Sequence, residues 1–361
     1  MQSSSKKSPG SGSEKAAAGW PLPGSNAIRN AILLAVILTV ALSSLPGCRK
    51  AHSHRVLKLA HGLPPDHPVH KAMVYMADRC LAISDGKLEI EIYPSEQLGA
   101  EQQCVELLQI GSLAITKVSA TAMESFTDDY KVLGLPYLFE DEDHSHRVLD
   151  SDIGRDLLNS THNVLLHGLC FYDAGSRSFY TVNKPILHPD DLRGLKIRVM
   201  KSKTAMDMVK ALGGSPTPIS FGELYTALQS GVVDGAENNP PSLYTSRQYE
   251  VCKHYSLDEH TTVPDVLIIS MHVWNKLDAN EKAWLQQAAD ESVPVQRRLW
   301  QESVEESLRE MQHAGVTIYY PEKEPFATRI EPLIESYKTQ ESIYSYIMRI
   351  RDMGRKTHAE Q

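Results

Sequence analysis

The feature that most constrains the fold is an alternation of strand and helix patterns that begins near residue 56. Residues 88–92 are Leu-Glu-Ile-Glu-Ile, and this strict alternation of apolar and charged side chains predicts a half-buried strand. Gly111 follows the helix expected at 101–110, where a glycine commonly ends a helix. The other expected elements are strands at 56–60, 113–118, 166–172, 195–199, 232–233, 266–269 and 316–320, and helices at 70–82, 203–212, 220–228, 278–315 and 327–353. This order predicts an α/β fold with a largely parallel sheet.

Two of these helices carry recognisable start signals. Ser220 and Glu223 stand three residues apart, the spacing of a capping box. The stretch 278–281 is expected to cap the long helix, and Pro294 predicts a kink within it.

The chain is long enough for two lobes of ordinary size. It has 361 residues, of which 42% are hydrophobic, so it can bury a large core. No internal repeat and no linker rich in proline or glycine follows residue 50. We therefore expect lobes that the chain crosses several times, and not two domains in series.

The overall charge excludes one class of partner. The formal net charge is −8 and the sequence pI is about 6.0, with no basic stripe along the chain. Nucleic acid is not expected as a partner, and any functional positive charge must be local.

The N-terminus has the pattern of an export signal. Arg29 precedes an apolar run at 31–42, and Leu-Pro-Gly-Cys follows at 45–48. This ending resembles the bacterial lipobox, so we expect residues 1–48 to be a tail and lipoprotein-type signal, with Cys48 lipidated and the protein tethered to a membrane. Pro46 is unusual in that motif, so a soluble periplasmic product is one alternative, and a single membrane anchor is another. All three place the domain outside the cytoplasm.

The other cysteines have no metal-binding spacing. Cys80, Cys104, Cys170 and Cys252 are expected to be free buried thiols, with a Cys80–Cys104 bridge as the alternative.

No catalytic or cofactor motif is present. The chain lacks a Gly-x-Ser-x-Gly elbow, a P-loop, a His-Glu-x-x-His motif and a Cys-x-x-Cys pair, so neither an enzyme nor a cofactor is expected. The enzymatic alternative is a secreted lyase or hydrolase that uses His61 with Glu237 or Asp265. The metal-binding alternative is a periplasmic lipoprotein whose ligands come from residues 141–146 and from an N-terminal histidine cluster: His52, His54, His61, His67 and His70.

Three polar segments follow predicted strands. Arg198 lies at the carboxyl end of the strand at 195–199, where open α/β sheets bind ligands, and its fork of donors suits a carboxylate. Arg177 follows Gly175 at what could be a crossing between lobes. Asn238 ends the segment 231–238 and can present an amide. From spacing alone, a solvated surface position explains Arg198 better than a binding role does. A structural salt bridge explains Arg177 equally well, and a simple turn explains Asn238 better.

Together the segments resemble one family, the solute-binding subunits of TRAP (tripartite ATP-independent periplasmic) transporters, the DctP-like group. The resemblance covers about residues 56–353. It depends on six segments in family order: Ile-Tyr-Pro-Ser-Glu-Gln-Leu-Gly (92–99), Leu-Pro-Tyr-Leu-Phe (135–139), Gly-Leu-Lys-Ile-Arg-Val (194–199), Gly-Ser-Pro-Thr-Pro (214–218), Glu-Leu-Tyr-Thr-Ala-Leu-Gln (223–229) and Val-Asp-Gly-Ala-Glu-Asn (233–238).

The resemblance implies a two-lobed periplasmic-binding-protein-like fold with hinge strands and long helices that span the lobes. Lobe I is expected at 54–174 with 264–303, and lobe II at 175–263 with 304–353. A small organic acid would bind between them and be delivered to the small and large membrane permease subunits.

The resemblance also implies roles for individual residues. Arg198 matches the family arginine that pairs with the ligand carboxylate, and Arg177 matches a second arginine beside it. Asn238 matches an asparagine that holds the same carboxylate, and Phe221 matches an aromatic residue of the cleft. The helix that begins at 220–223 is expected to turn its free N–H groups toward the anion.

Ligand specificity is expected to come mainly from the N-terminal lobe. Ser119 and Ala122 stand where sialic-acid-binding members carry Glu and Arg, which weighs against sialic acid. The candidate contacts of this lobe are His61, Lys117, Ser119 and Thr121, and Glu237 is a further candidate. His61, Ser119, Asn239 and Asp265 would suit a hydroxylated ligand. We therefore expect a uronate or related sugar acid, with a C4-dicarboxylate as the alternative.

Overall fold

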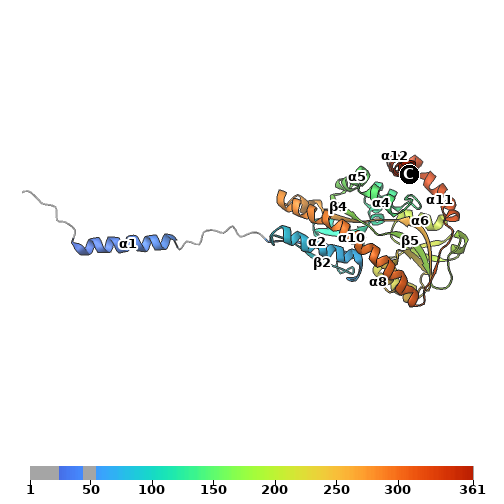
Figure 1. Cartoon of the computed structure of the whole chain (residues 1–361), viewed down its shortest axis with the longest axis horizontal. Helices are drawn as coiled ribbons and strands as arrows, with labels where there is room; N and C mark the ends of the chain where they lie inside the picture. The colour runs from blue at the N-terminus through green and yellow to red at the C-terminus, as the bar shows by residue number, and fades with distance from the viewer. Residues whose placement is uncertain (1–23, 44–53, 361) are drawn as a thin grey trace, which may run out of the picture. The chain divides into compact units, whose positions relative to one another are not determined.

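The computed structural model describes residues 24–43 and 54–360 of the chain, which belong to two separate units (Figure 1). In the first unit, Ser25–Ser43 form helix α1. No helix in the described ranges has both the length and the apolar character needed to cross a membrane. Cys48 and His52 lie outside the described residues, as do residues 1–23, so the expected lipidation is not visible here.

The second unit contains two β-sheets. The first sheet has five strands in the order β2-β1-β3-β10-β4. Their bounds are β1 Arg55–Ala60, β2 Leu88–Tyr93, β3 Ile115–Ser119, β4 Leu166–Tyr172 and β10 Asp265–Ser270. The central strands β3 and β10 are buried along their whole length, which explains why 266–269 is an uninterrupted apolar run.

The second sheet has six strands in the order β11-β9-β5-β8-β6-β7. Their bounds are β5 Ser176–Thr181, β6 Lys196–Val199, β7 Ser215–Pro218, β8 Gly235–Asn238, β9 His254–Thr262 and β11 Thr317–Tyr319.

Both sheets are mixed, so the expectation of a largely parallel sheet was wrong. In the first sheet β10 runs antiparallel to β3 and β4, while β1 pairs in parallel with β2 and β3. In the second, β5 runs antiparallel to β8 and β9. The cause is the connectivity: the chain passes from one sheet to the other after β4 and returns after β9, and both of these crossings are followed by an antiparallel strand. A third crossing, after β10, leads to β11, which pairs in parallel with β9.

The short strand expected at 232–233 lies instead at Gly235–Asn238. Helix α7 (Phe221–Gln229) ends just before it, and the N–H groups of Val232 and Val233 donate to the Ala227 carbonyl. These residues therefore cap the helix, and the ladder begins only beyond them.

Helices cover the sheets. The α-helices of this unit are α2 Pro68–Ile83, α3 Glu101–Gln109, α4 Glu142–Leu149, α5 Asp152–Ser160, α6 Lys203–Ala211, α7 Phe221–Gln229, α8 Pro240–Thr245, α9 Met271–Trp274, α10 Ala279–His313, α11 Glu324–Ser336 and α12 Glu341–Glu360. Short 3-10 helices lie at Ala120–Ser125, Asp128–Gly134, Thr161–Val164, Pro189–Leu192, Gln248–Glu250 and Tyr337–Thr339. The helix expected at 327–353 is two helices, because Gln340 leaves helical geometry (φ −109°, ψ 89°).

Helix α10 is the longest element and continues through Pro294. It packs against α2 from the part of the chain that forms the first sheet, and against α8 from the part that forms the second (Figure 1). One long helix thus holds both halves of this unit. The terminal helix α12 packs against α4 and α5, although the expected lobe limits assign it to the other lobe.

The crossing from β4 to β5 requires a glycine. Gly175 has φ +56°, and a Cβ on it would lie 2.9 Å from Nε1 of Trp300 on α10. A larger residue would be strained both in its backbone and against the indole ring. The four cysteines described are free and buried, so the Cys80–Cys104 bridge is not formed.

Candidate functional site

A pocket of about 310 Å³ lies between the two sheets. Strand β3 ends at Ser119, β6 ends just after Arg198, and β8 ends at Asn238, so the carboxyl ends of these strands face it. Its volume is in the range of small-ligand sites. Of the expected site residues, eight line the pocket: Lys117, Ser119, Arg177, Arg198, Phe221, Asn238, Asn239 and Asp265. The pocket lining does not include His61, Thr121 or Glu237.

Arg198 is almost completely enclosed but only partly bonded. Its neighbours Ile197 and Val199 are buried in the core, and Arg198 itself is 2% exposed. Its Nε donates to the Ile219 carbonyl at 2.8 Å, while Nη1 has no hydrogen-bond partner within the described residues. Burial lowers the pKa of this guanidinium. A buried cation with an unused donor at a pocket wall is suited to an anionic ligand.

Arg177 is fully engaged with the protein. Its Nε and Nη2 hold the Glu237 carboxylate at 2.5 and 2.9 Å, Nη2 also donates to the Glu237 carbonyl at 2.8 Å, and Nη1 donates to Asn238 Oδ1 at 2.8 Å. Burial alone would raise the pKa of Glu237, but the charges of Arg177 and of His260, 3.6 Å away, hold it at about 2. Glu237 thus compensates Arg177 from behind the pocket wall.

Lys117 is compensated as well. Its ammonium lies 3.1 Å from Asp265 Oδ1 and 3.6 Å from Glu101 Oε1. Burial opposes the charge, yet these two carboxylates raise the pKa of Lys117. Glu101 also accepts a hydrogen bond from the Ser119 N–H at 3.0 Å.

The two asparagines differ in how much they can offer a ligand. Asn239 caps helix α8 through its Oδ1 and donates from Nδ2 to the Ala174 carbonyl, so both ends of its amide are used. Asn238 Oδ1 accepts from Arg177 and from the Asn239 N–H, and no hydrogen bond of its Nδ2 is formed within the described residues. Asn238 therefore keeps a free donor at the pocket.

His61 is directed to other partners. Its Nε2 lies 3.0 Å from His70 Nδ1, and its Nδ1 accepts from the Leu63 N–H. Burial, together with the charge of Lys117, lowers the pKa of His61 to about 2. The structure pairs it with neither Glu237 nor Asp265, the partners that the enzymatic alternative requires.

His67 and Glu96 line the pocket, although neither was among the expected contacts of the organic ligand. His67 caps α2 and lies 3.2 Å from Ser242 Oγ, which is on the other side of the pocket. Glu96 accepts a hydrogen bond from the Gly222 N–H at 3.2 Å. Both could have been suspected, since His67 precedes Pro68 at a helix start and Glu96 lies in one of the family segments.

Glu96 changes the expected role of helix α7. The N-terminus of this helix was expected to face the anion, but a carboxylate of the protein already binds its Gly222 N–H. The capping box is also modified, because the Ser220 hydroxyl donates to the Glu223 carboxylate at 2.6 Å and caps no backbone group.

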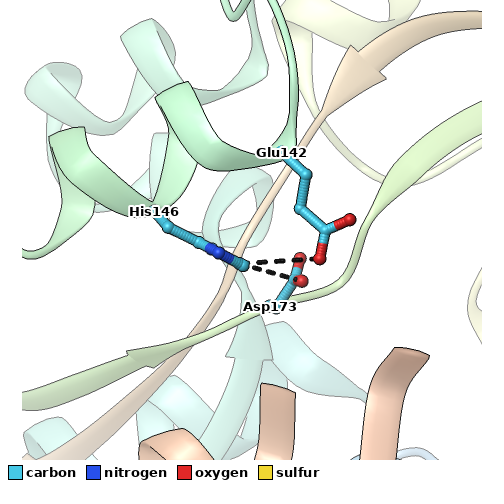
Figure 2. Close-up of side chains that lie close together, drawn as sticks. All are labelled: Glu142, His146 and Asp173. Carbon is cyan, nitrogen blue, oxygen red and sulfur yellow. Dashed lines mark hydrogen bonds and ion pairs between the residues drawn. The ribbon is translucent and has the colours of Figure 1, made fainter. Parts of the chain in front are cut away.

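The candidate metal ligands are mostly dispersed. His54 pairs with Glu89, His61 with His70, and His67 with Ser242. Within the described part of the chain, one cluster brings metal-ligating atoms together: Glu142, His146 and Asp173 (Figure 2). It lies outside the pocket lining.

Comparison with known proteins agrees with this architecture. Residues 59–340 match the family model DctP, bacterial extracellular solute-binding protein family 7. A TRAP periplasmic solute-binding protein of Bradyrhizobium sp. BTAi1, solved with D-galacturonate, is 38% identical, with a TM-score of 0.81 over 82% of this chain and 100% of that one. One from Anaerococcus prevotii, solved with D-glucuronate, is 35% identical, with a TM-score of 0.81 over 83% of this chain and 98% of that one.

A curated relative comes from the same family. The C4-dicarboxylate-binding periplasmic protein DctP of Rhodobacter capsulatus is 32% identical over 81% of this chain and 87% of its own length. Its family consists of periplasmic receptors that work with membrane permeases, and not of enzymes. The chain therefore belongs to the DctP family of bacterial extracellular solute-binding proteins, the periplasmic solute receptors of TRAP transporters.

Proposed function

We propose that this receptor captures a uronate in the periplasm, binds its carboxylate through Arg198, and delivers it to the membrane permease subunits. The observation that carries this proposal is the buried guanidinium of Arg198, which has one donor without a partner in the described residues. The solved relatives that contain galacturonate or glucuronate support the choice of ligand class.

The balance of charge in the pocket favours one carboxylate over two. Arg177 is neutralised by Glu237, and Lys117 by Asp265 and Glu101. Arg198 has no such ion pair within the described residues, so among the buried cations of the pocket it is the one that remains for a ligand; Lys201 also lines the pocket but is exposed to solvent. A C4-dicarboxylate, the class that the Rhodobacter capsulatus relative is named for, would leave its second negative charge to Lys201, whose exposure to solvent weakens the attraction.

The rest of the pocket suits a ligand rich in hydroxyl groups. Its lining includes the carboxylates of Glu96, Glu101 and Asp265, which can accept hydrogen bonds from hydroxyls. Ser119 and the Nδ2 group of Asn238 can donate. Phe221 adds an aromatic surface.

Contacts across the pocket are consistent with a closed receptor. Gln102 donates to the Lys201 carbonyl at 3.2 Å, Gly222 donates to Glu96, and His67 meets Ser242. We propose that lobes 54–174 with 264–303 and 175–263 with 304–353 open by breaking these contacts, and that closure excludes water around the Arg198–carboxylate pair.

Calorimetry tests the proposed role of Arg198. D-glucuronate, D-galacturonate and succinate are titrated into the wild type and into Arg198→Ala. We expect a uronate to bind more tightly than succinate, and the substitution to cost about 2–5 kcal/mol of binding free energy, as for removal of one partner of a buried charge pair. Arg193→Ala, which removes an exposed arginine three residues before β6, is the matched control. Unchanged uronate affinity in Arg198→Ala would refute the proposal.

We also propose that Cys48 is lipidated and tethers the receptor to a membrane, because it follows an apolar run and a Leu-Pro-Gly sequence. Mass spectrometry of the protein purified from membranes checks this. A mature N-terminus at any residue other than Cys48, or an unmodified Cys48, would contradict it.

A further inference from the structure

A second group of polar side chains converges away from the pocket, where α4 meets the end of β4. Glu142 and His146 are four residues apart on α4, so they lie on one face of the helix. Asp173 follows β4 directly. The imidazole of His146 points at both carboxylates (Figure 2), with Nε2 3.0 Å from Asp173 Oδ2 and 3.9 Å from Glu142 Oε1. One ligating atom from each residue lies within 4.8 Å of the others.

The two carboxylates lack a permanent positive partner. Neither forms an ion pair with a lysine or arginine anywhere in the described ranges, and His146 is the only basic residue paired with them. Gln301 supplies a neutral hydrogen bond to Glu142. The two carboxylates lie close enough to share His146 Nε2, so their negative charges repel each other. A bound cation would remove that repulsion.

The cluster is fixed on one side and open on the other. The Asp173 side chain is 4% exposed, and its Oδ1 accepts from the Gly175 N–H at 2.8 Å. The backbone of Asp173 is held by the Gln296 amide through two hydrogen bonds, of 2.8 and 2.7 Å. The Glu142 side chain, by contrast, is 45% exposed. A cation could therefore enter from the Glu142 side and keep a water ligand there.

We propose that Glu142, His146 and Asp173 bind a divalent transition-metal cation such as Zn²⁺, with water in the fourth position. One imidazole and two carboxylates are ligands that zinc accepts, and three protein ligands with one open position form a recurrent tetrahedral arrangement. The bound ion would replace the hydrogen bond between His146 and Asp173. It would tie α4 to residues 173–175, where the chain passes from the first sheet to the second. This proposal does not depend on the identity of the organic ligand.

Zinc titration of the full chain tests the site. We compare the wild type with Glu142→Gln and His146→Ala, and use Asp143→Asn as the control because Asp143 is the exposed carboxylate next to Glu142 on the same helix. We expect one zinc-binding event in the wild type and in Asp143→Asn. Its affinity should fall at least about tenfold in Glu142→Gln and in His146→Ala.

A second readout separates this site from the histidine pairs His61–His70 and His162–His167, which also present ring nitrogens. Zn²⁺ should raise the midpoint of thermal unfolding of the wild type and of Asp143→Asn, and Glu142→Gln should lose most of that rise. Glu142 is exposed enough that its substitution keeps the fold, which circular dichroism verifies. Absence of zinc binding in the wild type, or equal affinity and equal thermal shift in all variants, would show that His146 only shares a proton with the carboxylates, and the proposal would fall.

Discussion

The two buried arginines of the pocket, Arg177 and Arg198, have the same charge and similar burial but opposite bonding. Arg177 is 6% exposed and uses all three of its nitrogens on Glu237 and Asn238. Arg198 is 2% exposed and, among residues 24–43 and 54–360, makes one hydrogen bond, to the Ile219 carbonyl. One guanidinium is neutralised by its own protein, and the other is not.

This difference indicates a structural role for Arg177 and a ligand-binding role for Arg198. A guanidinium with a carboxylate already bonded to it gains little from a second anion, whereas an enclosed guanidinium with an unused donor destabilises the empty receptor. A ligand carboxylate would remove that cost. We infer that Arg177 positions Asn238 at the pocket wall and holds Glu237 behind it, while Arg198 is left free to bind.

The largest effect should come from Arg177→Ala measured as stability. The substitution leaves Glu237 buried without its main positive partner, so we expect the free energy of unfolding in the absence of ligand to fall by about 3–5 kcal/mol. Arg198→Ala removes an uncompensated charge and should leave this free energy unchanged or higher. Urea unfolding of both variants gives the comparison. Equal losses in the two would show that the arginines do not differ as their bonding indicates.

A smaller effect should follow from Asp265→Asn, which weakens the compensation of Lys117. With Glu101 as its remaining carboxylate partner, Lys117 would offer part of its charge to a second ligand carboxylate. We expect the affinity for succinate to rise relative to D-glucuronate by about tenfold, or about 1.4 kcal/mol. Calorimetric titrations measure the ratio, and Glu91→Gln, which removes an exposed carboxylate on β2, serves as the control. A constant ratio would mean that charge balance does not select the ligand.

The fold was predictable where side-chain patterns are local. Strand β4 has the predicted bounds, and β2, α3 and α6 differ from prediction by about one residue. Strand β9 was missed because its sequence, His-Tyr-Ser-Leu-Asp-Glu-His-Thr-Thr, lacks apolar alternation. Its polar residues Asp258 and His260 are nevertheless buried, because Asp258 accepts from the Phe179 N–H and His260 lies between Asp258 and Glu237. Such pairing joins residues far apart in the chain and leaves no local signal.

The site was predictable only in part, for the same reason. The family resemblance placed Arg177 and Arg198 at the pocket and implied that Arg198 pairs with the ligand, but it gave no sign that Glu237 neutralises Arg177. Glu237 reaches Arg177 because β5 and β8 are antiparallel, with Ser178 opposite Asn238 and Phe179 opposite Glu237. That register, 60 residues away in sequence, decides which arginine is neutralised. The same limit hid Glu96, whose partner Gly222 lies on the other side of the pocket.

The smallest effect concerns Glu96, and it tests whether Arg198 is truly uncompensated. Glu96 accepts from the first turn of α7, and Arg198 is among the charges that lower the pKa of Glu96 against the raising effect of burial. Glu96→Gln keeps an oxygen acceptor but removes the charge that favours the helix N-terminus. We expect the contact across the pocket to weaken by about 0.3–1 kcal/mol and D-glucuronate affinity to fall about two- to fivefold. Gln97→Glu, which adds a carboxylate at the neighbouring exposed residue, controls for general charge effects in calorimetry.

The sign of the Glu96 effect carries more information than its size. If the Glu96 carboxylate serves mainly to hold α7, its removal favours the open receptor and D-glucuronate affinity falls. We expect this outcome because Glu96 accepts a hydrogen bond from Gly222 and forms none with Arg198 within the described residues. If the affinity for D-glucuronate rises instead, the Glu96 carboxylate competes with the ligand carboxylate for the positive charge of Arg198. Glu96, on the opposite side of the pocket, would then be a counter-charge of Arg198. The two arginines would differ only in the distance to their carboxylate partners, and not in whether they have one.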